Sequence, residues 1–177
     1  MTHRFKTLAI AAAAVLAILP STASAGGGTK TNLVAAAVSS KDHQTLVAAV
    51  KAAGLVDTLA TGGPFTLFAP TDAAFARLPA GTVDNLLQPE NRDKLRAVLT
   101  YHVVPGKVSA AQLVEAIRKN GGQATLTTVQ GGTISASMAG SSIAITDAAG
   151  GKAIVTTADL MQSNGVIHVT DAVSLPM

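Results

Sequence analysis

The sequence contains no cysteine, no tryptophan, one tyrosine and four phenylalanines. Without cysteine the chain cannot form disulfides, thiolate zinc sites, iron–sulfur clusters or a cysteine nucleophile. The scarcity of aromatic rings also leaves little material for the stacking platforms that bind nucleic-acid bases. These absences exclude disulfide scaffolds and several classes of catalytic and metal site.

The chain also has little net charge. Its 13 lysines and arginines and 10 aspartates and glutamates give a net charge of +3. Two of the basic residues, Arg4 and Lys6, lie in a predicted leader, so the remainder carries 11 − 10 = +1. Nucleic-acid-binding domains present a strongly basic surface, which this balance does not supply. No nucleic-acid partner is therefore expected.

The first 25 residues have the three parts of a secretory signal peptide. A short basic start precedes the apolar run of residues 8–19, and Ala23, Ser24 and Ala25 form a cleavage site of small residues. The run is shorter than the ~20 apolar residues of a spanning helix. We expect export to the periplasm or the extracellular space and no membrane span after cleavage. A flexible segment over residues 26–30 then precedes one domain over residues 31–177.

The amino-terminal half of this domain has the pattern of several short helices. Apolar residues recur every three or four positions between residues 32 and 59, again between residues 83 and 101, and again between residues 109 and 119. Asp42 is expected to cap the second helix, and Gly54 to end it, because glycine readily adopts a left-handed backbone. Residues 65–69 interrupt the helices with a short strand of aromatic and β-branched residues.

The carboxyl-terminal part has the alternation of β-strands. Apolar and polar residues alternate in short runs between residues 124 and 157, with glycine-containing turns between them. Residues 103–108 are expected to form a strand, a turn and a strand, and residues 166–173 the final strand. Asp159 is expected to cap a single helical turn. The pattern predicts an α+β domain with a helical first half.

No motif for catalysis or metal binding is present. His43, His102 and His168 are far apart in the sequence and lack the spacing of metal ligands. The G-x-S-x-G and S-x-x-K motifs of serine hydrolases are missing, and Gly150-Gly151-Lys152 lacks the other residues of a phosphate loop. We therefore expect a protein that is not an enzyme and holds no metal or cofactor.

Three segments together resemble the fasciclin (FAS1) domain family. Thr66 to Phe75 (TLFAPTDAAF) resembles its first signature, Leu99 to Gly106 (LTYHVVPG) its central tyrosine–histidine motif, and Asn164 to Pro176 (NGVIHVTDAVSLP) its second signature. The order and the spacing both match. The resemblance covers residues 31–176.

The resemblance implies a twisted β-sandwich or wedge of about seven strands with a flanking group of helices. It implies a non-catalytic function in cell adhesion, with a protein or matrix partner at the cell surface, and we expect a monomer. In animal members the tyrosine–histidine segment is linked to partner recognition, and the matching residues here are Tyr101 and His102. The alternative is a carrier of an apolar ligand, because a branch in photosynthetic microbes uses this fold to bind a carotenoid.

The same motif residues also have structural interpretations. Those in the two signatures are expected to begin a helix, form a turn or lie in the final strand: Thr71, Asp72, Asn164, Gly165, His168 and Asp171. His102 falls in phase with Leu95, Val98 and Leu99, so it is expected to be a buried histidine bonded to the backbone. Tyr101 lies one step round the helix and is the residue of the pair expected to reach the surface.

The leader gives the first testable prediction. If residues 1–25 are removed on export, the exported protein should begin at Gly26, which mass spectrometry of the intact native protein can measure. Exported material that still carries residues 1–25 would contradict the signal-peptide interpretation.

Overall fold

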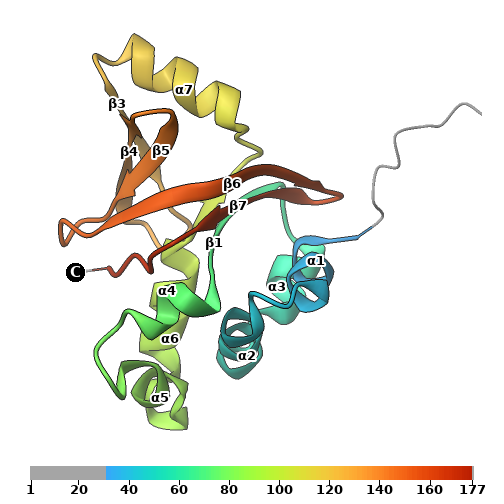
Figure 1. The fold of residues 1–177 in the computed structure, drawn as a ribbon. Coiled ribbons are helices and arrows are strands. Elements are labelled where there is room, and N and C mark those ends of the chain that lie inside the picture. The colour runs from blue at the N-terminus through green and yellow to red at the C-terminus, as the bar shows by residue number, and fades with distance from the viewer. Residues whose placement is uncertain (1–30, 177) are drawn as a thin grey trace, which may run out of the picture.

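The computed structural model describes residues 31–176, which form an α+β domain (Figure 1). The predicted signal peptide, the segment 26–30 and Met177 lie outside the described residues. The helices are α1 (Leu33–Ser39), α2 (Gln44–Ala53), α3 (Val56–Thr61), α4 (Asp72–Ala76), α5 (Thr82–Leu87), α6 (Arg92–Tyr101) and α7 (Ala110–Lys119), with a 3-10 turn at Pro89–Asn91. The expected helical first half is confirmed.

Seven strands form one sheet, which confirms the predicted fold class. They are β1 (Phe65–Pro70), β2 (Val103–Pro105), β3 (Gln123–Thr127), β4 (Thr133–Ala139), β5 (Ser142–Thr146), β6 (Lys152–Gln162) and β7 (Gly165–Thr170). Their order is β2-β1-β7-β6-β5-β4-β3, and only the β1–β7 pair is parallel. The amide of Val129 donates to the carbonyl of Val103 at 2.8 Å, so the chain after β3 approaches β2 and nearly closes the sheet.

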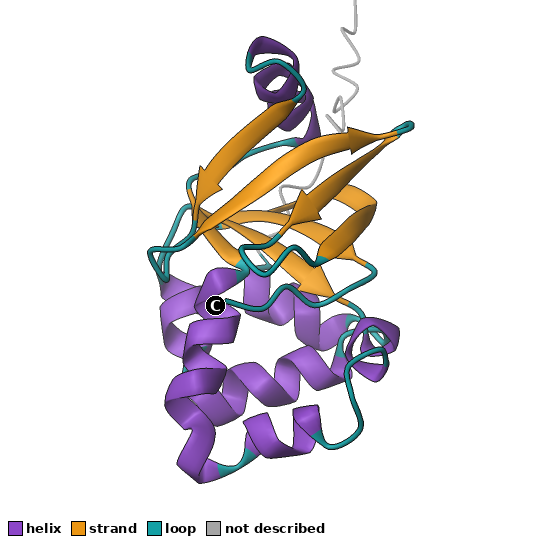
Figure 2. Ribbon diagram, turned by 90° about the vertical axis from the view of Figure 1, so that its left-hand side faces the viewer, coloured by secondary structure: helices purple, strands orange, loops and turns teal. Residues whose placement is uncertain are grey.

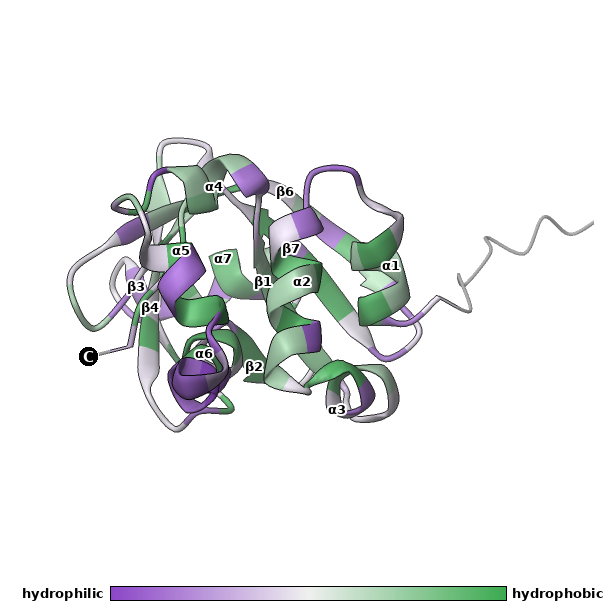
Figure 3. Ribbon diagram, turned by 90° about the horizontal axis from the view of Figure 1, so that it is seen from below, coloured by the Kyte–Doolittle hydropathy of each residue, from purple (hydrophilic) through white to green (hydrophobic). Residues whose placement is uncertain are grey.

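The sheet separates two hydrophobic cores, because successive side chains of a strand point to opposite faces. Leu67 and Ile167 pack with α1, α2 and α6 on one face, whereas Phe68 and Val155 pack with α7 on the other. Figure 2 shows most helices gathered below the sheet and one helix above it. Seen from below in Figure 3, α2 and α6 carry both hydrophobic and hydrophilic residues, as expected for helices that bury one side.

Local signals in the sequence locate several element ends correctly. Gly54 ends α2 with a left-handed backbone, at φ 69°. Ser109 and Gln112 form the predicted capping box at the start of α7. Asn164 and Gly165 form the turn between β6 and β7. Each signal depends on residues within a few positions, which explains why sequence alone was sufficient.

Three local predictions are wrong. Residues 107–108 form no strand, because the amide of Val108 donates to the side chain of Thr66 at 2.8 Å instead of joining a ladder. Asp159 begins no helical turn: it lies within β6, at an irregularity in the pairing with β7, and has φ 59°. The final strand ends at Thr170, because the Asp171 carboxylate accepts the amide of Ile154 at 2.7 Å and the chain turns away.

The buried side of α6 gives the second prediction. Leu99 is buried in the core between α6 and the sheet, so Leu99→Ala removes packed methyl groups and leaves a cavity. Unfolding by urea should show a loss of about 2–5 kcal/mol. Val129→Ala is the control, because Val129 is exposed and its truncation should change stability by less than about 0.5 kcal/mol. Equal losses for the two variants would contradict the assignment of this core.

Candidate functional site

The side chain of Tyr101, in the central motif, is buried. It is 1% exposed, so the expectation that it reaches the surface is wrong. Its hydroxyl donates to the carbonyl of Thr133 at 2.8 Å and accepts the amide of Ala148 at 2.9 Å. Tyr101 therefore joins the end of α6 to β4 and to the loop after β5. Its role in partner recognition stays a prediction, and its ring offers no contact surface in this conformation.

His102 is also buried, at 3% exposed, and is bonded to the backbone as expected. Its Nδ1 lies 2.8 Å from the carbonyl of Val98, which can only accept, so Nδ1 carries the ring hydrogen. Its Nε2 accepts the amide of Ser174 at 3.0 Å. Burial lowers the pKa of His102, and the Val98 carbonyl and the Asp147 carboxylate only partly oppose this effect. His102 thus joins α6 to the carboxyl-terminal segment as a neutral imidazole.

His168 has the same role with the opposite tautomer. Its Nε2 donates to the carbonyl of Val108 at 2.7 Å, and its Nδ1 accepts the amide of Asp159 at 3.3 Å. The ring also stacks on Phe68, with 5.5 Å between the ring centroids. Burial lowers the pKa of His168, although the Val108 carbonyl and Asp159 raise it in part. Neither histidine has a free ring nitrogen with which to bind a metal or a ligand.

The first signature connects two helices. Thr71 caps its own helix α4 by accepting the amide of Ala74 at 3.2 Å. Asp72 instead accepts the amides of Gln44 at 3.2 Å and Thr45 at 2.7 Å, and so caps α2. Partial burial raises the pKa of Asp72, but these bonds to the carboxylate outweigh burial and lower it below its ordinary value. The prediction that Asp42 caps α2 is therefore wrong.

The second signature begins with a polar side chain that holds two helices. Asn164 Oδ1 accepts the amide of Leu33 at 2.9 Å, and its Nδ2 donates to the carbonyls of Leu59 at 2.7 Å and Gly62 at 3.1 Å. A Cβ atom at Gly165 would overlap the carbonyl oxygen of Phe65, so only glycine allows β7 to approach β1 here. This signature therefore ties α1 and α3 to the sheet.

The signature ends with an acidic residue that fixes the chain after β7. Besides Ile154, Asp171 binds Arg77 through its carboxylate at 3.2 Å and its carbonyl at 3.0 Å. Much of the Arg77 side chain is exposed, so this ion pair adds little stability. The motif residues thus join helices, strands and the carboxyl-terminal segment to one another, and together they form a structural framework.

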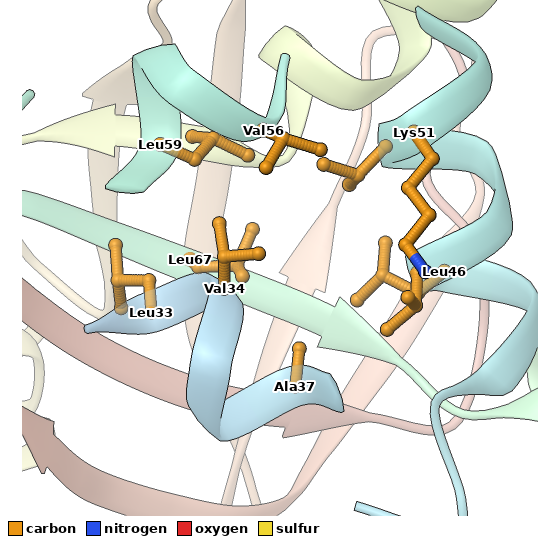
Figure 4. Close-up of a pocket in the computed structure, with 10 residues that line it drawn as sticks. Leu33, Val34, Ala37, Leu46, Lys51, Val56, Leu59 and Leu67 are labelled. Carbon is orange, nitrogen blue, oxygen red and sulfur yellow. The ribbon is translucent and has the colours of Figure 1, made fainter. Parts of the chain in front are cut away.

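A small apolar pocket lies between the first three helices and β1. Leucine and valine side chains from α1, α2, α3 and β1 converge on it (Figure 4), with the Lys51 chain at one side. Its volume is about 20 Å³, whereas ligand sites typically measure about 300–1,000 Å³. The pocket therefore does not offer the groove that a rod-like carotenoid needs.

A larger cleft lies on another side of α1 and was missed by the sequence analysis. It has a volume of about 280 Å³, and its lining is half polar, with His43, Gln162 and three hydroxyl residues, and half aliphatic. His43 is 6% exposed, and its Nδ1 lies 2.8 Å from the hydroxyl of Ser40. The serine three positions before the histidine was the available signal, but the walls of the cleft come from segments far apart in the chain.

The described residues contain no cluster of three or more potential metal ligands. Within residues 31–176, no helix has the length and apolar character needed to cross a membrane.

Comparisons with known proteins agree with the resemblance. A family model described as the fasciclin domain matches residues 41–176. The chain is 51% identical over 148 residues to protein sll1483 of Synechocystis sp., covering 81% of this chain and 73% of that protein. It is 34% identical over 159 residues to immunogenic protein MPB70 of Mycobacterium bovis, covering 87% and 74% respectively.

Two further relatives are longer or more distant. Human periostin is 33% identical over 137 residues, which cover 76% of this chain and 15% of periostin. Among solved structures, a FAS1 domain pair from the insect cell adhesion molecule Fasciclin I matches with a TM-score of 0.56 and 23% identity. That match covers 74% of this chain and 44% of the insect chain, and at this identity it shows the fold alone.

The two neutral histidines generate the third prediction. Below about pH 6.5 the unfolded chain binds protons at His102 and His168, whereas the folded chain does not until its lowered pKa values are reached. The free energy of unfolding should therefore fall as the pH falls from 7.5 to 5. Each histidine contributes at most about 1.4 kcal/mol per pH unit.

His102→Gln isolates one of these contributions. The variant removes one titrating group, so its stability should depend less steeply on pH than that of the unmodified chain, by at most one proton. Urea unfolding at several pH values measures both slopes. Identical slopes would show that His102 is protonated equally in the folded and unfolded states.

Proposed function

Because the chain belongs to the fasciclin (FAS1) domain family, we propose that it is an exported, non-catalytic module that binds a protein or matrix partner at the cell surface. Family membership is the observation that carries this proposal, since FAS1 domain proteins are known for adhesion and matrix roles. The fold neighbour comes from a cell adhesion molecule. The predicted leader supports export, to either the periplasm or the extracellular space.

The surface offers one region that suits a protein partner. Val38, Leu160 and Met161 are exposed by 40–53%. Leu160 lines the cleft beside α1, and so do the chain neighbours of Val38 and Met161. Apolar residues that gather at one place on a surface are typical of protein-binding sites. The buried tyrosine–histidine motif would support such a surface by holding the fold, rather than by touching the partner.

The fourth prediction tests this region with matched variants. The labelled protein should bind intact cells of its source organism saturably, and protease treatment of the cells should abolish binding. Val38→Ser removes one apolar contact and should weaken binding several-fold, because buried apolar contacts contribute about 1–3 kcal/mol. Val129→Ser is the control, since Val129 is 44% exposed and Val38 is 49% exposed.

Three outcomes would contradict the proposal. Binding that is not saturable would exclude a specific partner at the cell surface, and binding that survives protease treatment would exclude a protein as that partner. Colour and extractable pigment in the purified native protein would instead favour the carrier of an apolar ligand, which stays an untested alternative.

A further inference from the structure

The turn between α7 and β3 consists of an asparagine and two glycines at the edge of the domain (Figure 1). Asn120 follows the last residue of α7 and is exposed, as are Gly121 and Gly122. Gly121 has φ 73° and Gly122 has φ 105°, both in the left-handed region that favours glycine. No residue of this turn belongs to either hydrophobic core, so a change of conformation here disturbs little packing.

An asparagine followed by a glycine is a chemically reactive pair. Asparagine is a thermolabile residue, because the next backbone nitrogen can attack the carbonyl carbon of its side-chain amide. Glycine has no Cβ atom to obstruct that approach, and it gives the backbone the freedom to bring the two atoms together. The sequence contains two such pairs, Asn120-Gly121 and Asn164-Gly165. The fold constrains the two pairs to different extents.

The first pair is weakly held. The side chain of Asn120 makes one hydrogen bond, from its Nδ2 to the carbonyl of Ala116 at 2.9 Å. Among the described residues, the amide nitrogen of Gly121 has no acceptor, although that of Gly122 donates to Ile117 at 2.8 Å. A Cβ atom at Gly121 or Gly122 would meet no atom within 4 Å beyond its chain neighbours. The attacking nitrogen is therefore unpaired, and the backbone has room to rotate toward the side chain.

The second pair is firmly held. The side chain of Asn164 accepts the amide of Leu33 and donates to carbonyls at the end of α3. Gly165 is buried in β7, where a Cβ atom would overlap the carbonyl of Phe65. To react, the Asn164 side chain would have to leave both helices, and the start of β7 would have to move away from β1. Folding therefore suppresses the reaction at this pair.

We infer that Asn120 is a site of spontaneous deamidation, an inference that is independent of the proposed function. Hydroxide takes the hydrogen from the nitrogen of Gly121, and this nitrogen bonds to the side-chain carbonyl carbon of Asn120. The carbon–nitrogen bond of the side-chain amide then breaks, and its nitrogen takes a proton from water and leaves as ammonia. Water opens the resulting cyclic imide at either carbonyl, which produces aspartate or isoaspartate at position 120. The net change consumes water, releases ammonia and involves no oxidation.

Deamidation changes the end of α7. The new carboxylate has no hydrogen to donate, so the bond from position 120 to the carbonyl of Ala116 is lost. It also places a negative charge at the carboxyl end of a helix, where the helix dipole is already negative. The isoaspartate product adds a methylene group to the main chain, which displaces Gly122 from the carbonyl of Ile117. Amide hydrogen exchange at Gly122 should therefore be faster in the modified protein.

The test compares the two pairs within one molecule. The purified native protein is incubated at mildly alkaline pH and digested with trypsin, which cleaves after lysine and arginine. Residues 120–152 and 153–177 are then separate peptides, each with one asparagine. Mass spectrometry should show the first peptide converting at least about tenfold faster than the second, equivalent to about 1.4 kcal/mol of activation free energy. A sample digested before incubation measures any conversion during the digest itself.

Three controls separate the effect of the fold from that of the sequence. In urea both peptides should convert at similar rates, because unfolding frees Asn164. Asn85 is exposed but is followed by Leu86, so the peptide of residues 78–92 should convert far more slowly than the first peptide. Asn120→Ser removes the amide and should leave the mass of its peptide unchanged throughout the incubation.

Four results would overturn the inference. Conversion of the first peptide in urea but not in the folded protein would show that the fold protects Asn120 as well. Equal rates for the two peptides in the folded protein would show that the contacts of Asn164 give no protection. Conversion at Asn85 as fast as at Asn120 would show that glycine does not make the site reactive. No conversion even in urea would show that the pair itself is inert.

Discussion

The burial of strand β7 along its whole length is the constraint on which the rest of this fold depends. All six residues from Gly165 to Thr170 are buried, between parallel β1 and antiparallel β6. Every polar group on or beside such a strand needs a partner within the protein. His168 therefore binds the backbone at Val108 and Asp159, and Asn164 binds the ends of two helices. The second signature is thus a set of connections that attach the helices to a buried strand.

Features that depend on residues close together in the sequence were predicted correctly, whereas features that depend on residues far apart in the sequence were not. The row of apolar residues on α6 (Leu95, Val98 and Leu99) and the glycine that ends α2 both depend on residues within about one helical turn. Both were predicted from the sequence. Asp42 was wrongly expected to cap α2, because the residue that binds the first amides of that helix is Asp72, 27 positions from Thr45. Asp159 was wrongly expected to cap a helical turn of its own, whereas it binds the amide of Ala110 at the start of α7, 49 positions away. Tyr101 was expected at the surface because one buried side was assumed for α6. That helix instead ends between the two cores, so Leu99 and Tyr101 are buried in different ones.

The same distinction explains why the motif could be recognised from sequence while the cleft could not. Tyr101 and His102 are adjacent and were identified together. The cleft is lined by residues of α1, β1, β6 and β7 and of the loops beside α1, so its lining spans residues 31 to 167. Helix α1 therefore has two functions: it closes a small apolar pocket with Leu33 and Val34, and it forms one wall of the cleft through Ala36.

The size of the cleft constrains how such a protein could hold a partner. A cleft of about 280 Å³ is slightly smaller than the ~300–1,000 Å³ of typical ligand sites, so a contact made there alone would be small and weak. Repeated domains overcome such weakness, because linking sites raises the overall avidity by about 10²–10⁴ without new contacts. The domain described here matches only 15% of periostin, so periostin has room for further domains. Under the proposed function, firm attachment by weakly binding domains requires many copies to meet a repetitive partner, so binding to cells should depend on the density of the protein at the surface.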